Sequence, residues 1–257
     1  MKSVIFLTFF LFACTPKDES NAKTDYSVNQ SQNKAEKDSL WLADKKEKEK
    51  SKLNDSIELV YNLIDVQTLS ADIFVDLKYA TEDNFMKQRV YFSLDRALLQ
   101  KDVAERLVNC QKYLTELNSN YHLLIYDALR PVDVQWRMWR ALDTIPSKER
   151  GKFVSNPISG SVHNYGAAVD ITICDQNGKP LDMGAGFDDI REIAYPSMEQ
   201  YYLDKGELSV EQVNNRKLLR KVMKSQGFRN LSTEWWHFNA CSRAEAKLKY
   251  KALEKEP

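Results

Sequence analysis

Apolar residues recur with two different periods along this chain. In residues 94–117 they return every three or four positions, which predicts a helix capped by Ser93. The same spacing in residues 213–223 predicts a second long helix. That helix opens on a capping box, in which Ser209 and Gln212 satisfy each other's backbone amides.

Shorter apolar stretches alternate or run continuously and are rich in β-branched and aromatic residues, which is typical of strands. We expect strands in residues 73–79, 122–126, 168–173 and 231–239. A terminal helix is expected to begin at Ser242, since a glutamate follows three positions later. Long helices combined with separated strands predict the α+β class, with a largely antiparallel sheet.

The beginning of the chain has a different character. Its apolar run, residues 4–13, is shorter than the roughly 20 residues that span a bilayer. The run ends in Leu-Phe-Ala-Cys, which resembles a bacterial lipobox with Cys14 as the acylated residue. We therefore predict a lipoprotein signal peptide at 1–13, with an ordinary cleaved signal or an unmodified cysteine as the alternatives. Residues 14–56 are polar and charged, which predicts a disordered tether.

Composition narrows the possibilities for the remaining residues, 57–257. The whole chain carries 37 basic and 37 acidic residues, and this balance gives no indication of a nucleic-acid partner. About two hundred residues suffice for one domain with its own core. Cys110, Cys174 and Cys241 have no metal-ligand spacing. Export would permit one disulfide, but the sequence does not choose a pair.

Two of the three histidines in the chain lie beside acidic residues. A straight strand would separate His163 from Asp170 by roughly 23 Å, too far to share an ion with bonds near 2 Å. Gly166 can supply the necessary reversal, because glycine accepts a positive φ. His237 can then complete the three protein ligands of a catalytic zinc, leaving Glu234 as the general base. Singly, each residue is more typical of ordinary packing; jointly, they favour one zinc ion per chain.

The chain between the expected strand 122–126 and the first ligand contains Asp-Ala-Leu-Arg-Pro. Arg130 in this stretch lies at a junction between a strand and a helix, so its guanidinium can project toward a pocket. A salt-bridged surface arginine is the ordinary alternative. His122 stands alone at a strand start, and we expect it to be structural.

These motifs resemble those of a known family. Ser-x-His-x-x-Gly-x-Ala-x-Asp, followed at a distance by Glu-x-Trp-His, is similar to the zinc peptidases that include D-alanyl-D-alanine dipeptidases, D,D-carboxypeptidases and the hedgehog domain. The segments Tyr-Ala-Thr-x-Asp-Asn-Phe, Asp-x-x-Arg-Pro and Met-Gly-x-x-Phe-Asp resemble the dipeptidases in particular. The resemblance implies that Arg130 stabilises the oxyanion and that Asp188 binds the substrate ammonium together with Tyr79. It also implies that Ser161 contacts the C-terminal half of the substrate.

The expected function is therefore zinc-dependent hydrolysis of D-Ala-D-Ala in cell-wall peptide turnover or salvage. The alternatives are a D,D-carboxypeptidase that trims peptidoglycan stems and a non-catalytic, zinc-stabilised binding domain, which the presence of Glu234 and Arg130 disfavours. The expected location is a bacterial membrane in the periplasm or cell envelope, reached through a lipid anchor on Cys14. Residues 189–208 carry no recognisable signal and are expected to form a variable lid.

Overall fold

The computed structural model describes residues 36–37, 39–48, 52 and 56–257. The chain divides into two units, Met1–Glu49 and Lys50–Pro257. Within the first unit, residues 39–48 are helical with exposed side chains. The predicted signal peptide 1–13 and Cys14 lie outside the described residues, so these two assignments stay predictions, as does the tether 14–56.

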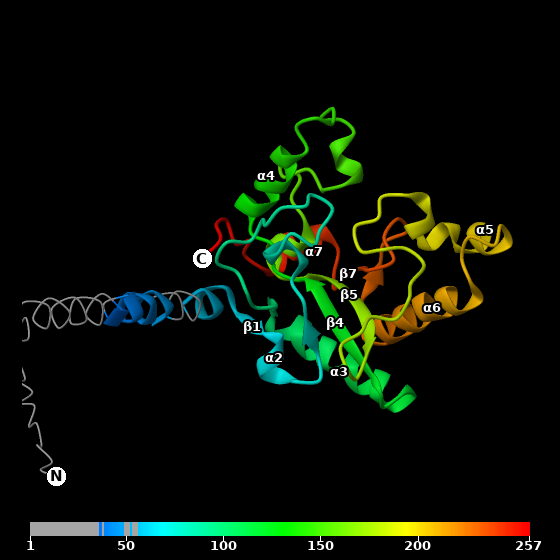
Figure 1. Ribbon diagram of the computed structural model, residues 1–257, viewed down its shortest axis with the longest axis horizontal. Helices are drawn as coiled ribbons and strands as arrows, with labels where there is room; N and C mark the ends of the chain where they lie inside the picture. Colours follow the sequence, from blue (N-terminus) through cyan, green and yellow to red (C-terminus); the bar gives the residue numbers. More distant parts are fainter. Residues whose placement is uncertain (1–35, 38, 49–51, 53–55) are drawn as a thin grey trace, which may run out of the picture. The chain divides into compact units, whose positions relative to one another are not determined.

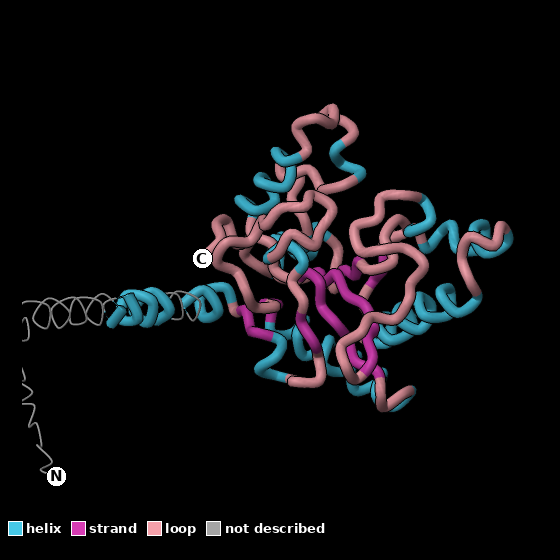
Figure 2. Tube along the Cα trace, in the orientation of Figure 1, coloured by secondary structure: helices cyan, strands magenta, loops and turns pink. Residues whose placement is uncertain are grey.

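A five-stranded sheet forms the centre of the second unit (Figures 1 and 2). In spatial order its strands are β2 (Phe74–Val75), β4 (Tyr121–Asp127), β5 (Ala168–Asp175), β7 (His237–Asn239) and β6 (Arg229–Asn230). All neighbouring pairs are antiparallel except β2 and β4. The predicted α+β class with a largely antiparallel sheet is confirmed.

Two long helices lie against one face of this sheet. Helix α3 (Lys101–Leu117) packs along β4, and α6 (Val210–Ser225) packs against α3 and along β5. Ile171 and Ile173 of β5 join the buried residues of both helices in the larger hydrophobic core. The remaining helices and 3-10 turns are α2 (Val66–Leu69), α4 (Val132–Ala141), α5 (Glu199–Asp204), α7 (Arg243–Lys249), η1 (Lys78–Ala80), η2 (Arg150–Lys152), η3 (Val162–Tyr165), η4 (Glu192–Ala194) and η5 (Pro196–Met198).

The expected helix over residues 94–117 is wrong in its first part. Leu98–Gln100 form a short strand, β3, which pairs with β1 (Leu63–Asp65), and the helix begins only at Lys101. All three residues of β3 are buried, so neither face of this strand is exposed. A continuous buried run of this kind does not show the alternation of a half-buried strand. Its sequence pattern therefore cannot be distinguished from that of the helix that follows it.

Two expected strands are also shorter than predicted. Residues 73–79 contain only β2 before η1 begins, and residues 231–236 form a loop that precedes β7. Both helix-start predictions at capping boxes are confirmed: Ser209 accepts from Gln212 N at 3.1 Å, and Ser242 accepts from Glu245 N at 3.2 Å. These boxes were found because the cap is a local interaction.

The segment 189–208, for which a variable lid is expected, consists of short elements. It contains η4, η5 and α5, and buried Arg216 of α6 anchors this region by donating to the carbonyl oxygens of Met183 at 2.6 Å and Ile193 at 3.0 Å. Arg220, one turn along α6, binds both carboxylate oxygens of Glu199, at 2.7 and 2.6 Å. Helix α6 therefore holds this segment in place beside the sheet.

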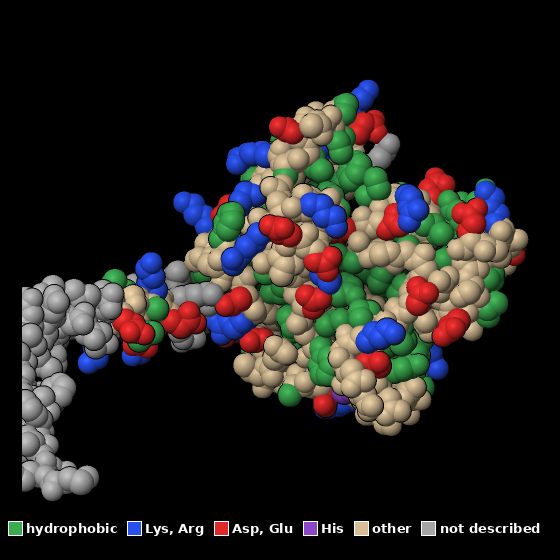
Figure 3. Space-filling view, viewed as in Figure 1, with side chains coloured by type: hydrophobic (Ala, Val, Ile, Leu, Met, Phe, Trp, Pro, Cys, Tyr) green, Lys and Arg blue, Asp and Glu red, His purple; other side chains and the backbone are tan. Residues whose placement is uncertain are grey.

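Neither the charges on the visible surface nor the three described cysteines indicate a further site. On the face seen in Figure 3, basic and acidic side chains are interspersed. Cys110, Cys174 and Cys241 are buried and free. Among the residues that the structure describes, no helix is long and apolar enough to cross a bilayer.

The chain reverses direction between η3 and β5, as the spacing of His163 and Asp170 requires. Gly166 ends η3 with φ of 62°, in the left-handed region. Its backbone lies so close to β1 and β3 that a Cβ atom would come within 2.7 Å of Leu63 Cδ2 and 3.3 Å of Gln100 N. Both the conformation and the close approach require glycine here.

We expect Gly166→Ala to lower the free energy of unfolding by about 1–3 kcal/mol, because the left-handed conformation and the contact with Leu63 both penalise a Cβ atom. Chemical denaturation of the purified domain measures this change. Gly151→Ala is the matched control, since nothing lies within 4 Å of a Cβ at that position and its φ is not positive. Equal stability of the two variants would contradict the prediction.

Candidate active site

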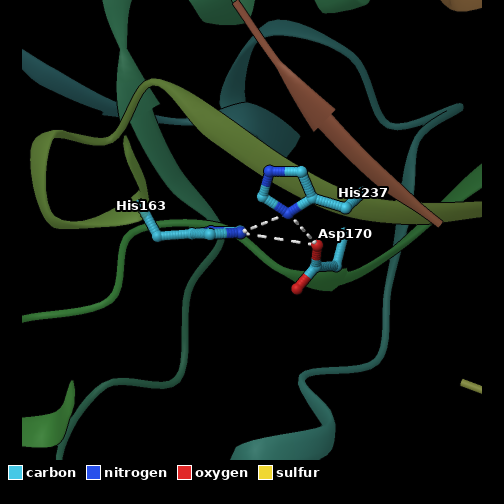
Figure 4. Close-up of side chains that lie close together, drawn as sticks. All are labelled: His163, Asp170 and His237. Atoms are coloured by element: carbon cyan, nitrogen blue, oxygen red, sulfur yellow. Dashed lines mark hydrogen bonds and ion pairs between the residues drawn. The ribbon is translucent and has the colours of Figure 1, made fainter. Parts of the chain in front are cut away.

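Three buried side chains from separate elements converge beside the central strands of the sheet (Figure 4). His163 comes from η3, Asp170 from β5 and His237 from β7. His163 Nε2 lies 3.2 Å from His237 Nδ1 and 3.4 Å from Asp170 Oδ1, and the latter two atoms are 2.9 Å apart. The three residues predicted as metal ligands are thus brought together.

These distances fit a metal ion. Ligand atoms in a tetrahedral site with bonds of about 2.0–2.1 Å stand roughly 3.3 Å apart, close to the separations observed here. His163 Nδ1 donates to the carbonyl oxygen of Ala128 at 2.6 Å, which leaves the lone pair of Nε2 directed at the other two residues. Two imidazoles and one carboxylate form a donor set suited to zinc.

Asp170 is held in its ionised form. Burial opposes its negative charge, but the adjacent His163 and His237 outweigh that effect and keep the pKa of Asp170 well below its usual range. Its other oxygen, Oδ2, lies 3.5 Å from Arg130 Nη2. A permanently charged carboxylate is the state that a metal ligand requires.

Glu234 lies in the loop before β7 and not in a regular strand, where residues three apart would face opposite sides. Its Oε2 is 3.8 Å from His237 Nδ1, and 33% of its side chain is accessible. Burial raises the pKa of Glu234, and the proximity of His237 offsets part of this increase. An accessible carboxylate with a raised pKa beside the three clustered side chains has the position and proton affinity of a general base.

Arg130 is fixed by a buried network. It donates to Asp127 Oδ2 from Nε at 2.9 Å and from Nη2 at 2.6 Å, and to Gln135 Oε1 at 3.3 Å. The second oxygen of Asp127 accepts from the hydroxyl of Tyr91 at 2.6 Å. The guanidinium also lies over the ring of Tyr79, 5.2 Å from its centre. A cation held this rigidly can face a developing negative charge without reorganisation.

Tyr79 and Asp188 meet at another part of the site, as predicted. The Tyr79 hydroxyl donates to the Asp188 carboxylate, 3.0 and 3.1 Å from its two oxygens. Asp188 adopts a φ of 62°, which is uncommon for a residue other than glycine. Burial and the nearby charge of Asp170 raise the pKa of Asp188 well above its ordinary value, although Tyr79 partly stabilises the anion. A cationic ligand in contact with Asp188 would lower the free-energy cost of ionising this buried carboxylate.

The site opens into a small cavity of about 140 Å³. Its walls include every residue assigned to the site from sequence: Tyr79, Arg130, Ser161, His163, Asp170, Asp188, Glu234 and His237. Apolar side chains also line the cavity, among them Phe153, Val154 and Trp236. The volume is below the range of drug-sized ligand pockets, so the cavity suits a very small molecule.

Ser161 is the N-cap residue of η3, and its hydroxyl group can also act as a hydrogen-bond donor. Its Oγ accepts a hydrogen bond from His163 N at 3.3 Å as the cap of this turn. The residue is only 5% exposed, yet it lines the cavity. The hydroxyl proton is not used by the capping interaction, so Ser161 can donate to a ligand.

The chain is similar to proteins of one known family. The model of the D-ala-D-ala dipeptidase family matches residues 60–254. The chain belongs to this family. A D-alanyl-D-alanine dipeptidase of Escherichia coli is 35% identical over 179 residues, 68% of this chain and 83% of the relative. A protein of the same description from Enterococcus faecalis is 33% identical, over 63% of this chain and 83% of its own length. One from Synechocystis is 29% identical, over 55% of this chain and 68% of its own length.

Members of the D-ala-D-ala dipeptidase family are zinc-dependent, and this chain is accordingly a peptidase. The residues that converge were predictable from the sequence, but some of the residues that hold them in place were not. Asp127 could have been noticed from its position three residues before Arg130. Tyr91 gave no signal, because its contact with Asp127 joins residues that are distant in the sequence. His122 is structural, as expected: it contacts Asp72 O at 2.9 Å and stacks on Phe74.

We expect Tyr91→Phe to lower the free energy of unfolding of this dipeptidase-family domain by about 1–3 kcal/mol, because buried Asp127 loses a hydrogen-bond donor that nothing replaces. Thermal or chemical denaturation measures the change. Tyr113→Phe is the control, since the Tyr113 hydroxyl makes no hydrogen bond within the described part of the chain. A Tyr91 variant as stable as this control would show that the network does not depend on the hydroxyl.

Proposed function

We propose that this protein hydrolyses the dipeptide D-Ala-D-Ala with one zinc ion held by His163, Asp170 and His237. The observation that carries the proposal is the triangle of three donor atoms, 2.9–3.4 Å apart, beside an accessible carboxylate. Its support from other proteins is the family to which the chain belongs and the printed description of its relatives.

Each side chain has a distinct task in this reaction. A zinc ion in such a site acts as a Lewis acid that polarises the scissile carbonyl and makes water more acidic. Glu234 accepts a proton from the attacking water and delivers it to the departing amine. Arg130, held by Asp127, stabilises the negative charge that develops on the carbonyl oxygen.

The cavity also supports a preference for free dipeptides. A dipeptide has an ammonium group one residue from the scissile bond, and Asp188 with Tyr79 lies within the same small cavity as the proposed metal ligands. An ammonium in contact with Asp188 gains a charge-assisted hydrogen bond. An acylated or longer substrate presents a neutral amide there and leaves the buried carboxylate poorly paired.

The main alternative is a D,D-carboxypeptidase acting on longer stem peptides. Such an enzyme has no use for an anionic group next to the scissile bond, and Asp188 lines this cavity. The non-catalytic alternative is disfavoured by Glu234 and Arg130, which both line the cavity. We further propose that the enzyme acts on dipeptides released from the cell wall, anchored in the envelope through Cys14.

We expect the domain from about residue 57 onward to bind one zinc ion and to lose it when His163, Asp170 or His237 becomes alanine, since each supplies one of three protein ligands. Elemental analysis of the purified variants measures the metal content. Glu234→Gln should keep zinc while the turnover number falls about a hundred- to ten-thousandfold, because only the proton acceptor is lost.

His122→Ala is the matched control, because this histidine lies away from the site and should keep both zinc and activity. Full zinc occupancy in all three ligand variants would remove the metal assignment. Near-normal turnover of Glu234→Gln would remove that residue from the mechanism.

We expect Asp188→Asn to lower kcat/KM for D-Ala-D-Ala by about 10- to 100-fold, because the contact with the substrate ammonium loses its charge. The kcat/KM for N-acetyl-D-Ala-D-Ala should change little, so the ratio of kcat/KM between the free and the acetylated dipeptide should fall. Steady-state kinetics on both substrates measures this. Asp143→Asn serves as the control, since that exposed carboxylate does not line the cavity. A wild-type enzyme that cleaves both substrates equally well would favour the carboxypeptidase.

A further inference from the structure

One cation of the cavity wall has no role in the mechanism described so far. Arg243 is the first residue of α7, is exposed, and lines the cavity together with the catalytic residues. In the portion of the chain that the structure describes, its guanidinium has no hydrogen-bond or ion-pair partner. The other arginine of the wall, Arg130, is bound to Asp127 and Gln135 and already has a role in the mechanism.

The acidic residues of the cavity do not neutralise Arg243. Asp170 contacts the two histidines, Asp188 accepts from Tyr79, and Asp189 is bound by Arg191. Glu234 lies nearest to His237, at 3.8 Å. Arg243 therefore remains a free positive charge at the cavity, and it is positioned to meet an anion that enters from outside.

Arg243 and Ser161 line the same cavity and come from two elements that pack on each other. Helix α7 packs on η3, the turn that Ser161 caps. Hydrogen bonds on both sides of α7 secure this contact: Ala240 N donates to Ala167 O at 2.8 Å, and Leu253 N donates to Asn164 O at 3.0 Å. The position of the cation is therefore set by backbone contacts as well as by its own side chain.

The substrate supplies an anion of the right kind. A free dipeptide carries an ammonium at one end and a carboxylate at the other, and an extended two-residue unit spans about 7 Å. With the ammonium at Asp188 and the scissile carbonyl near the three proposed ligands, the carboxylate needs a third binding group in the same cavity, whose wall also contains Ser161 and Arg243. Ser161 offers one hydroxyl donor, and a guanidinium offers paired donors whose geometry matches a carboxylate.

We propose that Arg243 is a specificity-determining residue that binds the C-terminal carboxylate of the substrate together with Ser161. The inference rests on the proposed peptidase function, but it applies equally to the carboxypeptidase alternative, because both classes of substrate end in a free carboxylate. Arg243 acts on recognition and not on the chemical step.

The test compares D-Ala-D-Ala with D-alanyl-D-alaninamide, which has the same scissile bond and a neutral C-terminus. Arg243→Met should lower kcat/KM for the acid about tenfold, mainly through KM, and should leave the value for the amide nearly unchanged. Arg243→Lys should recover part of the loss, since it restores the charge without the paired donors. The effect of Arg243→Met should shrink as salt is added, because the charge is exposed.

Arg229→Met is the matched control, as Arg229 is an exposed arginine of β6 that does not line the cavity. An equal loss for acid and amide in Arg243→Met, or no loss for either, would overturn the proposal. Failure of the dipeptidase function would be seen separately, as poor cleavage of D-Ala-D-Ala by the wild type. In that case the same comparison is made with N-acetyl-D-Ala-D-Ala and its amide.

Discussion

The register between β5 and β7 is the constraint on which the site depends. Asp170 lies directly opposite His237 in this antiparallel pair, and Val169 lies opposite Phe238. Side chains alternate between the two faces of a strand, so a shift of one residue would turn either ligand into the hydrophobic core. Buried Val169 and Phe238 prevent that shift, because it would bring them out of the core to the polar face. The apolar packing of one face thus fixes the chemistry of the other.

The pairing of β4 with β5 adds a second requirement. It sets Asp127 opposite Asp170, with an irregularity in the register just before this pair. Two buried carboxylates at neighbouring positions would repel each other in a medium of low dielectric constant. Arg130 lies between them, with two short hydrogen bonds to Asp127 and a longer contact to Asp170. Arg130, the proposed oxyanion-binding residue, therefore also offsets the repulsion between Asp127 and Asp170.

The sequence was informative where the determining interaction is local or the residue type is rare. Only three histidines occur in the chain, so the pattern around His163 and His237 had few competing explanations. Capping boxes were recognised because the two partners are three residues apart. The strand β3 was missed because its burial depends on β1, a contact between distant segments. Tyr91 and Arg243 were missed for the same reason: their significance lies in what the fold brings beside them.

The hydrogen bond from His163 to Ala128 has a consequence for how this site can evolve. The acceptor is a main-chain carbonyl, so no substitution of the side chain at position 128 deletes it. In many metal sites the partner that orients a ligating histidine is a carboxylate, which a single mutation can remove. Here the orientation of the imidazole is inherited from the path of the backbone after β4. Position 128 can therefore accept any side chain that fits its buried surroundings without loss of this hydrogen bond. The orientation of His163 is lost only if the backbone path itself changes.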